Sequence, residues 1–365
     1  MRYFKELDSL RAFAALSVVC HHWISHSNLI NKILHGPTGV TTFFVLSGFF
    51  TTFMVFKTKS KTEITRQTIS KTYGNLLLKR SLRIFPAYFV SLSVLWLFKD
   101  FYIEKDISKA FIYLCTFSTN FYFFNHQYFT GVFAHLWSIA TQEQFYLFWA
   151  LLLLILHSKF HFSGIVFLIA TGIACKYLLS DLPYFHLLPP VNFDSFGLGA
   201  LLAWQITYKP SRITGFYTKV KIPGLLCLLL YLVGIVIPFN PIPERTVIAI
   251  LALWLITYLI INSGSENLKF VFRNPALVFI GKISYGIYLF HNLIPQLTKK
   301  YVSIYILPGA PDVFVNHATL IVLTLNLIIL FSISALTWFL IEQPIAQWKN
   351  FKFLRINPFG RLREI

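Results

Sequence analysis

The stretch that decides the fold is residues 6–23, ELDSLRAFAALSVVCHHW, an apolar run that nevertheless carries an arginine and two histidines. Asp8 and Ser9 are favoured residue types at helix N-caps, so the sequence predicts a helix that begins just after them. Each helical residue advances about 1.5 Å and turns by about 100°. Arg11 and His22 are therefore expected on nearly one face, roughly 16 Å apart along the axis.

An ionisable side chain inside a membrane is costly and usually faces a bundle interior or a water-filled cavity. A single buried histidine is most often a polar contact between helices. An arginine and a histidine aligned on one face, as Arg11 and His22 are here, favour a reaction site instead.

The composition indicates a membrane protein. Of the 365 residues, 56 % are hydrophobic and 13 % are charged, whereas soluble domains carry about 25 % charged residues. Repeated apolar runs predict an all-α, polytopic bundle of transmembrane helices in a lipid bilayer. The formal net charge of +18 would suit nucleic acid, but in a membrane protein it marks cytoplasmic loops, so no nucleic-acid partner is expected.

The apolar runs predict about ten spans. They cover residues 10–26, 38–57, 84–102, 137–157, 161–180, 193–208, 222–240, 245–262, 279–298 and 315–341. The polar-spotted segment 107–124 is expected to be re-entrant or interfacial rather than an eleventh span. The first helix is expected to be retained, because no small-residue cleavage site follows it.

The distribution of charge predicts the orientation. With both termini in the cytoplasm, 22 of the 32 Lys and Arg residues fall in inner segments, seven in outer segments and three inside spans. This asymmetry agrees with the positive-inside rule. We expect a multi-pass protein of the inner (cytoplasmic) membrane of a bacterial cell. The sequence predicts one transmembrane domain over 1–345 and a basic cytoplasmic tail over 346–365. It leaves homo-oligomer formation open.

RSLRIFPAYF, from Arg80, marks where an inner loop meets the third predicted span. Arg80 and Arg83 lie one helical turn apart, and two guanidiniums suit phosphate oxygens because each presents a planar fork of donors. Taken alone, the pair fits a positive-inside anchor equally well. With Arg11 at the same depth, an anion pocket on the cytoplasmic side is the favoured interpretation.

Two further motifs place polar residues in apolar surroundings. FFVLSGFF, around Ser47 and Gly48, lacks the first glycine of a nucleophile elbow, so close helix packing is expected there. HLWSIATQEQFYL begins at His135, and its Glu143, expected at the outer mouth of the bundle, would orient His22 or hold a substrate hydroxyl. The competing interpretation of Glu143 is a carboxylate near the positive end of a helix dipole.

The candidate acceptor-binding residues are polar groups in or beside these motifs and the related stretch GKISYGIYLFH. They are Asp8, Asn120, His135, Gln142, Tyr285 and His291. His157 and His161 have the spacing of metal ligands but no acidic partner, and the four cysteines are scattered. No metal site is therefore expected.

In the order and spacing of its motifs, the chain resembles the acyltransferase 3 family of multi-pass membrane O-acyltransferases over nearly its whole length. The resemblance rests on Arg11 and His22 with ten residues between them, FFVLSGF, the Arg80–Arg83 pair, FSTNFYF around Asn120, HLWS with EQFY, GKISYGIYLFH and the closing IEQPI. The chain departs from many members at one position, where Gln142 takes the first of two acidic places and Glu143 keeps the second.

The resemblance implies transfer of an acyl group, usually acetyl, from cytoplasmic acyl-CoA to a hydroxyl of a glycan or glycolipid acceptor. It implies that His22 is the catalytic histidine, with Arg11 as its partner, and that Arg80 and Arg83 hold the donor. Acetyl-CoA is then a cosubstrate and no metal takes part. The chain ends without the soluble esterase-like domain of some members, so it is expected to act through its membrane domain alone.

Two mechanisms remain open. Either His22 accepts the hydroxyl proton as the oxygen attacks the thioester, or it forms an acetyl-histidine that relays the group across the membrane. Two rival functions also remain open. A transporter or flippase of a glycan intermediate would have a similar composition, although it needs no paired arginines and transporters often show internal repeats. Transfer of acetyl or succinyl to a small natural product is the other alternative.

Overall fold

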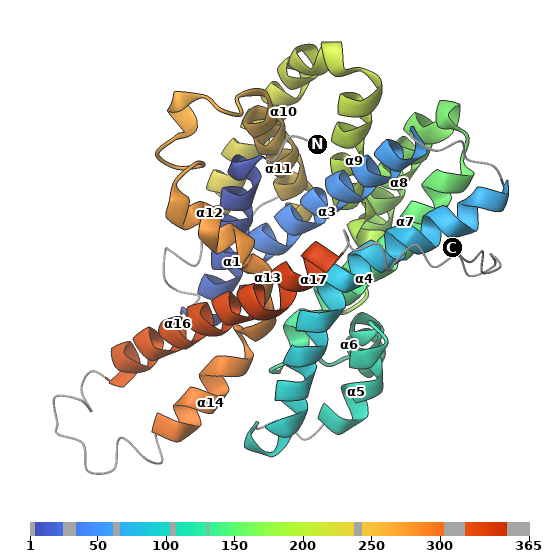
Figure 1. The fold of residues 1–365 in the computed structure, drawn as a ribbon. Coiled ribbons are helices and arrows are strands. Elements are labelled where there is room, and N and C mark those ends of the chain that lie inside the picture. Colours follow the sequence, from blue (N-terminus) through green and yellow to red (C-terminus); the bar gives the residue numbers. More distant parts are fainter. Residues whose placement is uncertain are drawn as a thin grey trace, which may run out of the picture.

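The computed structural model is a bundle of helices and describes residues 4–24, 34–60, 66–102, 107–129, 131–236, 243–302 and 318–348 (Figure 1). No strand occurs in these ranges, which confirms the all-α prediction for them. The longer helices are α1 Lys5–Trp23, α3 Gly36–Lys59, α4 Arg66–Leu97, α7 Trp137–Ile155, α8 His161–Leu178, α9 Phe193–Tyr208, α10 Ile213–Val236, α11 Glu244–Ile261 and α16 Ala318–Thr337. The short ones are α5 Ile107–Cys115, α6 Thr119–His126, α12 Pro275–Lys282, α13 Ser284–Phe290, α14 Leu293–Tyr301 and α17 Gln343–Trp348.

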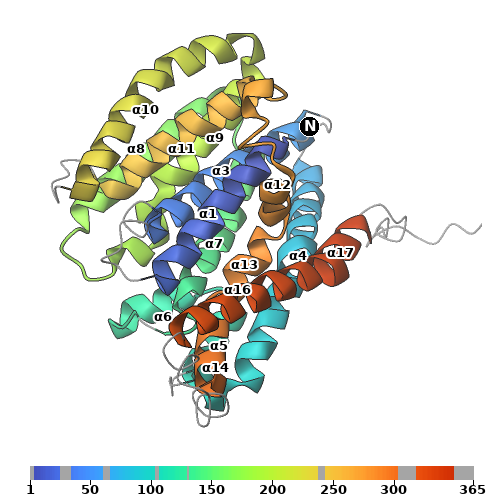
Figure 2. The ribbon, with the colours of Figure 1, turned by 90° about the vertical axis from the view of Figure 1, so that its left-hand side faces the viewer.

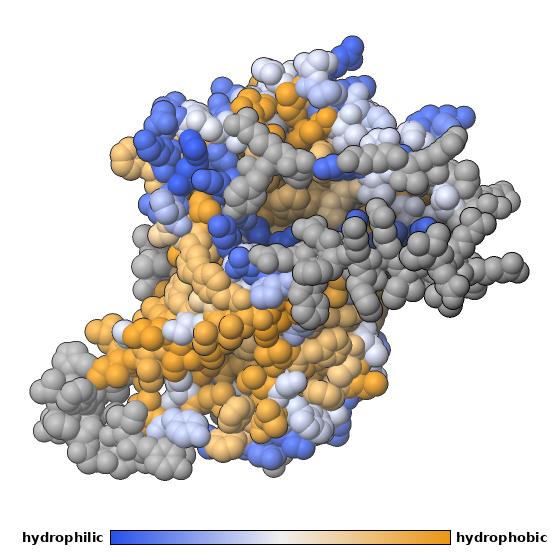
Figure 3. Space-filling view, in the orientation of Figure 1, coloured by the Kyte–Doolittle hydropathy of each residue, from blue (hydrophilic) through white to orange (hydrophobic). Residues whose placement is uncertain are grey.

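Within the described ranges, 6 helical stretches are long and apolar enough to cross a membrane. They are Gly36–Lys59, Ala134–Ile155, Ser158–Leu178, Pro210–Ile235, Glu244–Ile261 and Thr319–Ile345, and each overlaps a predicted span. The remaining predicted spans fall on α1, α4, α9 and the α12–α14 region. Apolar side chains gather over α16 and the adjoining part of α4, between more hydrophilic regions, as contact with lipid requires (Figure 3). The chain is a multi-pass membrane protein, while about ten crossings and cytoplasmic termini stay predictions.

The helices α1 and α3 lie in the middle of the bundle. In Figure 2, α10 and α11 form one edge, whereas α4, α16 and α17 lie toward the other. α1 packs against α3 and α12, and α3 packs most extensively against α9. The residues of α1 are therefore surrounded by protein over most of the helix.

The start of α1 differs from the prediction. The helix begins at Lys5 with Phe4 as its N-cap, and Asp8 and Ser9 lie inside the first turns rather than capping them. Glu6 accepts a hydrogen bond from Gly264 N at 3.0 Å, and Asp8 pairs with Arg11. Glu6 and Asp8 thus have tertiary and helix-face partners, whereas Ser9 Oγ is buried without a hydrogen-bond partner among the described residues.

Glycines bring the central helices into backbone contact. A Cβ atom added at Gly48 of α3 would lie 1.9 Å from the carbonyl oxygen of Phe196 in α9. One added at Gly199 of α9 would lie 1.9 Å from that of Val45 in α3. The packing role predicted for Gly48 is confirmed, because only a residue without a side chain fits this approach.

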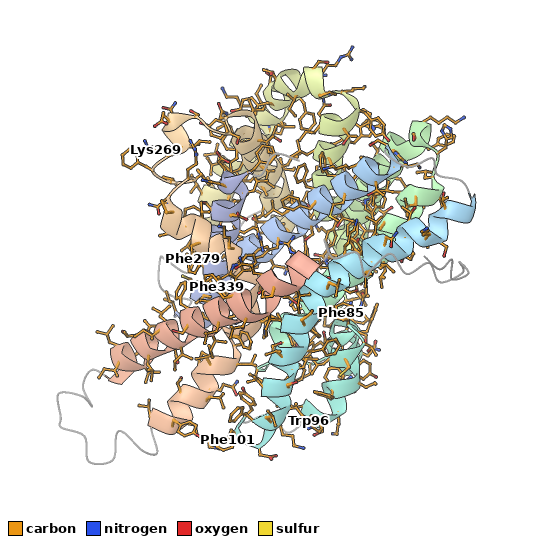
Figure 4. The ribbon with its side chains drawn as sticks, in the orientation of Figure 1. Phe85, Trp96, Phe101, Lys269, Phe279 and Phe339 are labelled. Atoms are coloured by element: carbon orange, nitrogen blue, oxygen red, sulfur yellow. The ribbon has the colours of Figure 1, made fainter. Side chains whose placement is uncertain are left out.

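Two segments are broken into short pieces. The segment 107–124 forms α5 and the first part of α6, separated at Phe117, whose φ of 52° ends the first helix. The predicted span 279–298 crosses α12, α13 and α14. Here the ring of Phe279 lies beside that of Phe339, with centroids 6.2 Å apart, and so joins α12 to a π-helical turn at Trp338–Glu342 (Figure 4). π-Helical turns are frequent at functional sites.

Candidate active site

Two cavities flank α1. The arginine cavity, of about 520 Å³, is lined by Arg11, Arg80 and Arg83 together with Asp8 and Glu143. The histidine cavity, of about 1620 Å³, is lined by His21, His22, His35, His135 and His186 among other residues. Because Arg11 and His22 are eleven residues apart on one helix, α1 presents them to the two cavities at depths that differ by roughly 16 Å.

Each arginine of the arginine cavity has a carboxylate near it. Arg80 donates from Nε and NH2 to Glu143, with distances of 3.0 and 2.7 Å to Oε1, and its guanidinium lies 4.3 Å from the centre of the Tyr146 ring. Arg11 NH1 lies 3.5 Å from Asp8 Oδ1. A bidentate pair of this kind fixes the Arg80 guanidinium in place.

Arg83 differs from its neighbour. It lines the same cavity and is exposed to it, yet within the described ranges no hydrogen bond or ion pair of Arg83 is formed. The buried Glu342 lies close enough to interact electrostatically with Arg83 and Arg11. Arg83 is thus the arginine of this cavity whose fork of donors is most available to an incoming anion.

The position of Glu143 corrects the sequence interpretation. It was expected at the outer mouth beside His22, but it lies in the arginine cavity and binds Arg80. Eight residues of helix separate it from His135, which is about 12 Å of rise. Two residues of one motif therefore reach different cavities. His135 remains in the histidine cavity with His22.

Two further imidazoles lie beside His22: His135, which also lines the histidine cavity, and His291, which is fully buried and does not line it. The His22 ring centre lies 5.1 Å from that of His291, which lies 4.7 Å from that of His135. His291 Nδ1 donates to the Tyr288 carbonyl oxygen at 2.8 Å, and His135 Nε2 donates to that of Leu289 at 3.2 Å. His135 Nδ1 lies 3.2 Å from Asn292 Nδ2. These hydrogen bonds fix the orientation of both imidazole rings beside His22.

His22 is itself exposed to the cavity, and the end of its helix is anchored. The next residue, Trp23, donates from its indole Nε1 to the carbonyl oxygen of His291 at 2.8 Å. The anchor ties the last turn of α1 to the end of α13. A fixed backbone with an accessible imidazole is what a base or nucleophile requires.

A thin partition separates the two cavities. Val40 and Tyr288 line both of them. The Tyr288 hydroxyl donates to the carbonyl oxygen of His135 at 2.9 Å and lies 2.5 Å from Ser138 Oγ. Val40 and Tyr288 thus form part of the wall between the arginine cavity and the histidine cavity.

The remaining predicted site residues are divided between the cavities and the core. Gln142 and Tyr285 line the arginine cavity, and the Tyr285 hydroxyl donates to the carbonyl oxygen of Ile84 at 3.0 Å. Asn120 lies in neither cavity, because its side chain pairs with the amide of Gln144 at 3.2 and 2.9 Å. This amide pair fastens α6 to α7.

The histidines with metal-like spacing are used in packing. His161 Nε2 lies 3.0 Å from the carbonyl oxygen of Leu156, beside the Lys59 ammonium, which donates to the same oxygen at 2.6 Å. Together they satisfy the end of α7. His157 accepts a bond from Lys159 N at 3.3 Å. In the ranges that the structure covers, no group of three or more His, Cys, Asp or Glu could hold a metal ion.

Two further residues, Glu342 beside the arginine cavity and Arg245 on the wall of the histidine cavity, were not singled out from the sequence. Glu342 is an acidic residue in an otherwise apolar helical stretch, and intramembrane carboxylates are usually functional. That signal was present in the IEQPI motif. Arg245 lines the histidine cavity, but as a lone arginine at a predicted outer boundary it carried no signal beyond loop charge.

Comparison with known proteins gives relatives of one kind. A Staphylococcus aureus (strain COL) protein named "Putative O-acetyltransferase SACOL0978" is 28 % identical over 334 residues, which cover 82 % of this chain and 52 % of that protein. "O-acetyltransferase OatA" of Staphylococcus aureus (strain NCTC 8325 / PS 47) is 26 % identical over 385 residues, which cover 97 % of this chain and 59 % of the relative. The chain thus spans between half and three fifths of the length of these relatives. No solved structure matches it.

A family model described as "Acyltransferase domain" matches residues 4–342, which include both cavities and every described residue of α1. The match covers nearly the whole chain and agrees with the resemblance seen in the motifs. The chain therefore belongs to the acyltransferase 3 family.

Proposed function

We propose that the protein transfers an acetyl group from acetyl-CoA to a hydroxyl of a glycan or glycolipid acceptor. The observation that supports this most is that one helix, α1, presents Arg11 to a cavity suited to anions and His22 to a second, larger cavity. A donor with phosphates at one end and a thioester at the other suits such a pair of cavities.

The donor phosphates would lie against Arg83 and Arg11. Arg83 is exposed to the arginine cavity, and its planar fork can bind a phosphate through two hydrogen bonds. Arg80 contributes positive charge, but two of its donor groups are already engaged by Glu143. The thioester end would then extend along α1, past Val40 and Tyr288, toward His22.

His22 would carry the chemistry. In the direct route, its unprotonated nitrogen accepts the proton of the acceptor hydroxyl while the oxygen attacks the carbonyl carbon of the thioester. The carbon–sulfur bond breaks, and the thiolate of CoA takes the proton back from His22. In the relay route, His22 attacks the thioester first, and the carbon–sulfur bond breaks to release the thiolate of CoA. The hydroxyl oxygen then attacks the carbonyl carbon of the acetyl-imidazole, the carbon–nitrogen bond to His22 breaks, and the hydroxyl proton balances the one that the thiolate takes up from solvent. Both routes balance with acetyl-CoA and the alcohol as the only reactants.

The test is acetyl transfer by purified protein in detergent, with radiolabelled acetyl-CoA and a panel of soluble oligosaccharides. His22→Ala is expected to abolish transfer, because it removes the imidazole that is proposed to take the proton or carry the acetyl group. His157→Ala is the matched control, since His157 is an exposed histidine outside both cavities. Full activity of His22→Ala, with an unchanged elution profile on size exclusion, would refute the proposed role.

The same experiment separates an acetyltransferase from a transporter or flippase. A transporter of a glycan intermediate would move its cargo without consuming acetyl-CoA, so neither free CoA nor labelled glycan would appear. Acetyl-CoA consumption that required a small natural product, rather than a glycan, would instead support the alternative acceptor class.

A further inference from the structure

The wall of the histidine cavity carries more positive than negative charge. Its cationic side chains are Lys176, Arg245 and Lys299, and Glu244 is the carboxylate among its lining residues in the described part of the chain. Lys176 is neutralised by the buried Asp194 at 2.5 Å. Glu244 is engaged by His35, whose Nδ1 lies 3.2 Å from Oε1.

Arg245 stands out among these cations. Its guanidinium lies 5.3 Å from the centre of the Trp137 ring, which holds the side chain against the cavity wall. Its NH1 atom is buried and has no hydrogen-bond partner among the described residues. Arg245 as a whole is half-buried, but a buried donor nitrogen without a partner is costly unless a ligand or water accepts from it.

Arg245 and His22 face the same cavity from adjacent elements. The ring of His22 contacts that of His21, with centres 5.2 Å apart, and His21 contacts His35 at 5.0 Å. His35 in turn bonds Glu244, the residue before Arg245. The end of α1, the start of α3 and the start of α11 thus form one continuous wall.

The imidazole of His186, which interacts electrostatically with Arg245, supplies no second positive charge. His186 lies between α8 and α9, and its ring packs against Trp137 with centres 5.8 Å apart. Burial and the charge of Arg245 lower the pKa of His186 to about 3, so His186 is neutral near pH 7. An anion in this part of the cavity would therefore be bound by Arg245, with Lys299 farther along the wall.

We propose that Arg245 binds an oxyanion of the acceptor, a carboxylate or a phosphate, and so places the hydroxyl to be acetylated near His22. This inference rests on the proposed function and adds the substrate class: an acidic glycan rather than a neutral one. The planar fork of arginine matches both kinds of oxyanion with two parallel hydrogen bonds. A neutral glycan leaves those donors without a partner, and such sites discriminate strongly against analogues that lack the expected group.

The test measures, by isothermal titration calorimetry, the binding of matched probes to the purified protein in detergent. One pair is methyl glucuronide and its methyl ester, and the other is methyl glucoside 6-phosphate and methyl glucoside. The wild type is expected to bind at least one charged probe about 10- to 100-fold more tightly than its neutral partner. The pair that shows the preference identifies carboxylate or phosphate.

Arg245→Gln is expected to reduce that preference to less than about threefold, because an amide keeps a donor but loses the charge and the fork. Arg245→Met is a second variant that keeps the stem over Trp137, in case the first does not fold. Arg212→Gln is the matched control, since Arg212 is an exposed arginine outside both cavities. Equal binding of charged and neutral probes by the wild type, or an unchanged preference in both Arg245 variants, overturns the proposal.

Acetyl transfer to the same probes distinguishes the two possible failures. If the Arg245-dependent preference is found but no probe or glycan is acetylated, the anion site stands and the proposed function fails. If neutral glycans are acetylated as well as charged ones by both wild type and Arg245→Gln, the proposed function stands and the acidic acceptor is wrong.

Discussion

At the scale of single residues, Arg80 and Arg83 lie one turn apart on α4 but have different surroundings. Two donor groups of Arg80 are engaged by Glu143, whereas Arg83 is exposed to the cavity and makes no such bond with a described residue. A phosphate that approaches the pair finds one guanidinium held and one available. The two arginines should therefore respond differently to the same substitution.

We expect Arg83→Lys to weaken acetyl-CoA binding about tenfold, because lysine keeps the charge but loses the bidentate fork. Arg80→Lys should weaken it less, and Arg80→Ala/Arg83→Ala should remove it. Titration calorimetry with acetyl-CoA on the purified variants measures all three. If lysine substitutes fully at both positions, the pair is only a positive-inside anchor.

The residue scale also shows what the sequence could and could not predict about the site. Arg11 and His22 were found because helix geometry relates residues close in sequence, and α1 has that geometry. Glu143 was misplaced because its partner, Arg80, lies 63 residues away along the chain. The contact depends on how α4 packs against α7, which no local pattern contains.

At the scale of elements, glycine backbones decide how closely α3 approaches α9. Gly48→Ala should destabilise the protein by about 1–3 kcal/mol, because the new methyl group would overlap the Phe196 carbonyl oxygen and the helices would have to separate. The quantity to measure is the thermal unfolding temperature of the purified protein, monitored by its intrinsic fluorescence.

Gly74 provides the matched control for this substitution. It also lies in a helix, α4, but nothing within 4 Å meets a Cβ atom added there. Gly74→Ala should therefore be neutral or stabilise the protein by up to about 1 kcal/mol, since alanine restricts the unfolded chain. Equal unfolding temperatures for the two variants would mean that α3 and α9 are not in backbone contact.

The elements also show the limits of hydropathy. It located the 6 stretches that are long and apolar enough to span. It placed the third span at 84–102, whereas α4 begins at Arg66, because the first part of α4 is polar and its helical structure depends on packing against α7 rather than on apolar periodicity. It also merged α12, α13 and α14 into one span, since short breaks leave the mean hydropathy unchanged.

At the scale of the whole molecule, the cationic residues of the two cavities belong to segments that are predicted to lie on opposite sides of the membrane. Arg80 and Arg83 adjoin the basic segment predicted to lie inside, whereas Arg245 and Lys299, on the wall of the histidine cavity, belong to segments predicted to lie outside. If this orientation holds, acetyl-CoA reaches the protein from the cytoplasm and the acceptor lies on the other side. The acetyl group would then cross the membrane along α1.

The orientation can be tested at the two ends of α8. Ser158 and Ser180 are exposed residues at opposite ends of the candidate span Ser158–Leu178. The positive-inside rule places the Ser158 end, beside Lys159, in the cytoplasm. In intact cells, a membrane-impermeant maleimide should therefore label Ser180→Cys and leave Ser158→Cys unlabelled until the membrane is permeabilised. The reverse pattern would invert the topology and assign the arginine cavity to the outer side, where acetyl-CoA is not available. The background for both variants is the chain with its four cysteines replaced by alanine, at Cys20, Cys115, Cys175 and Cys227.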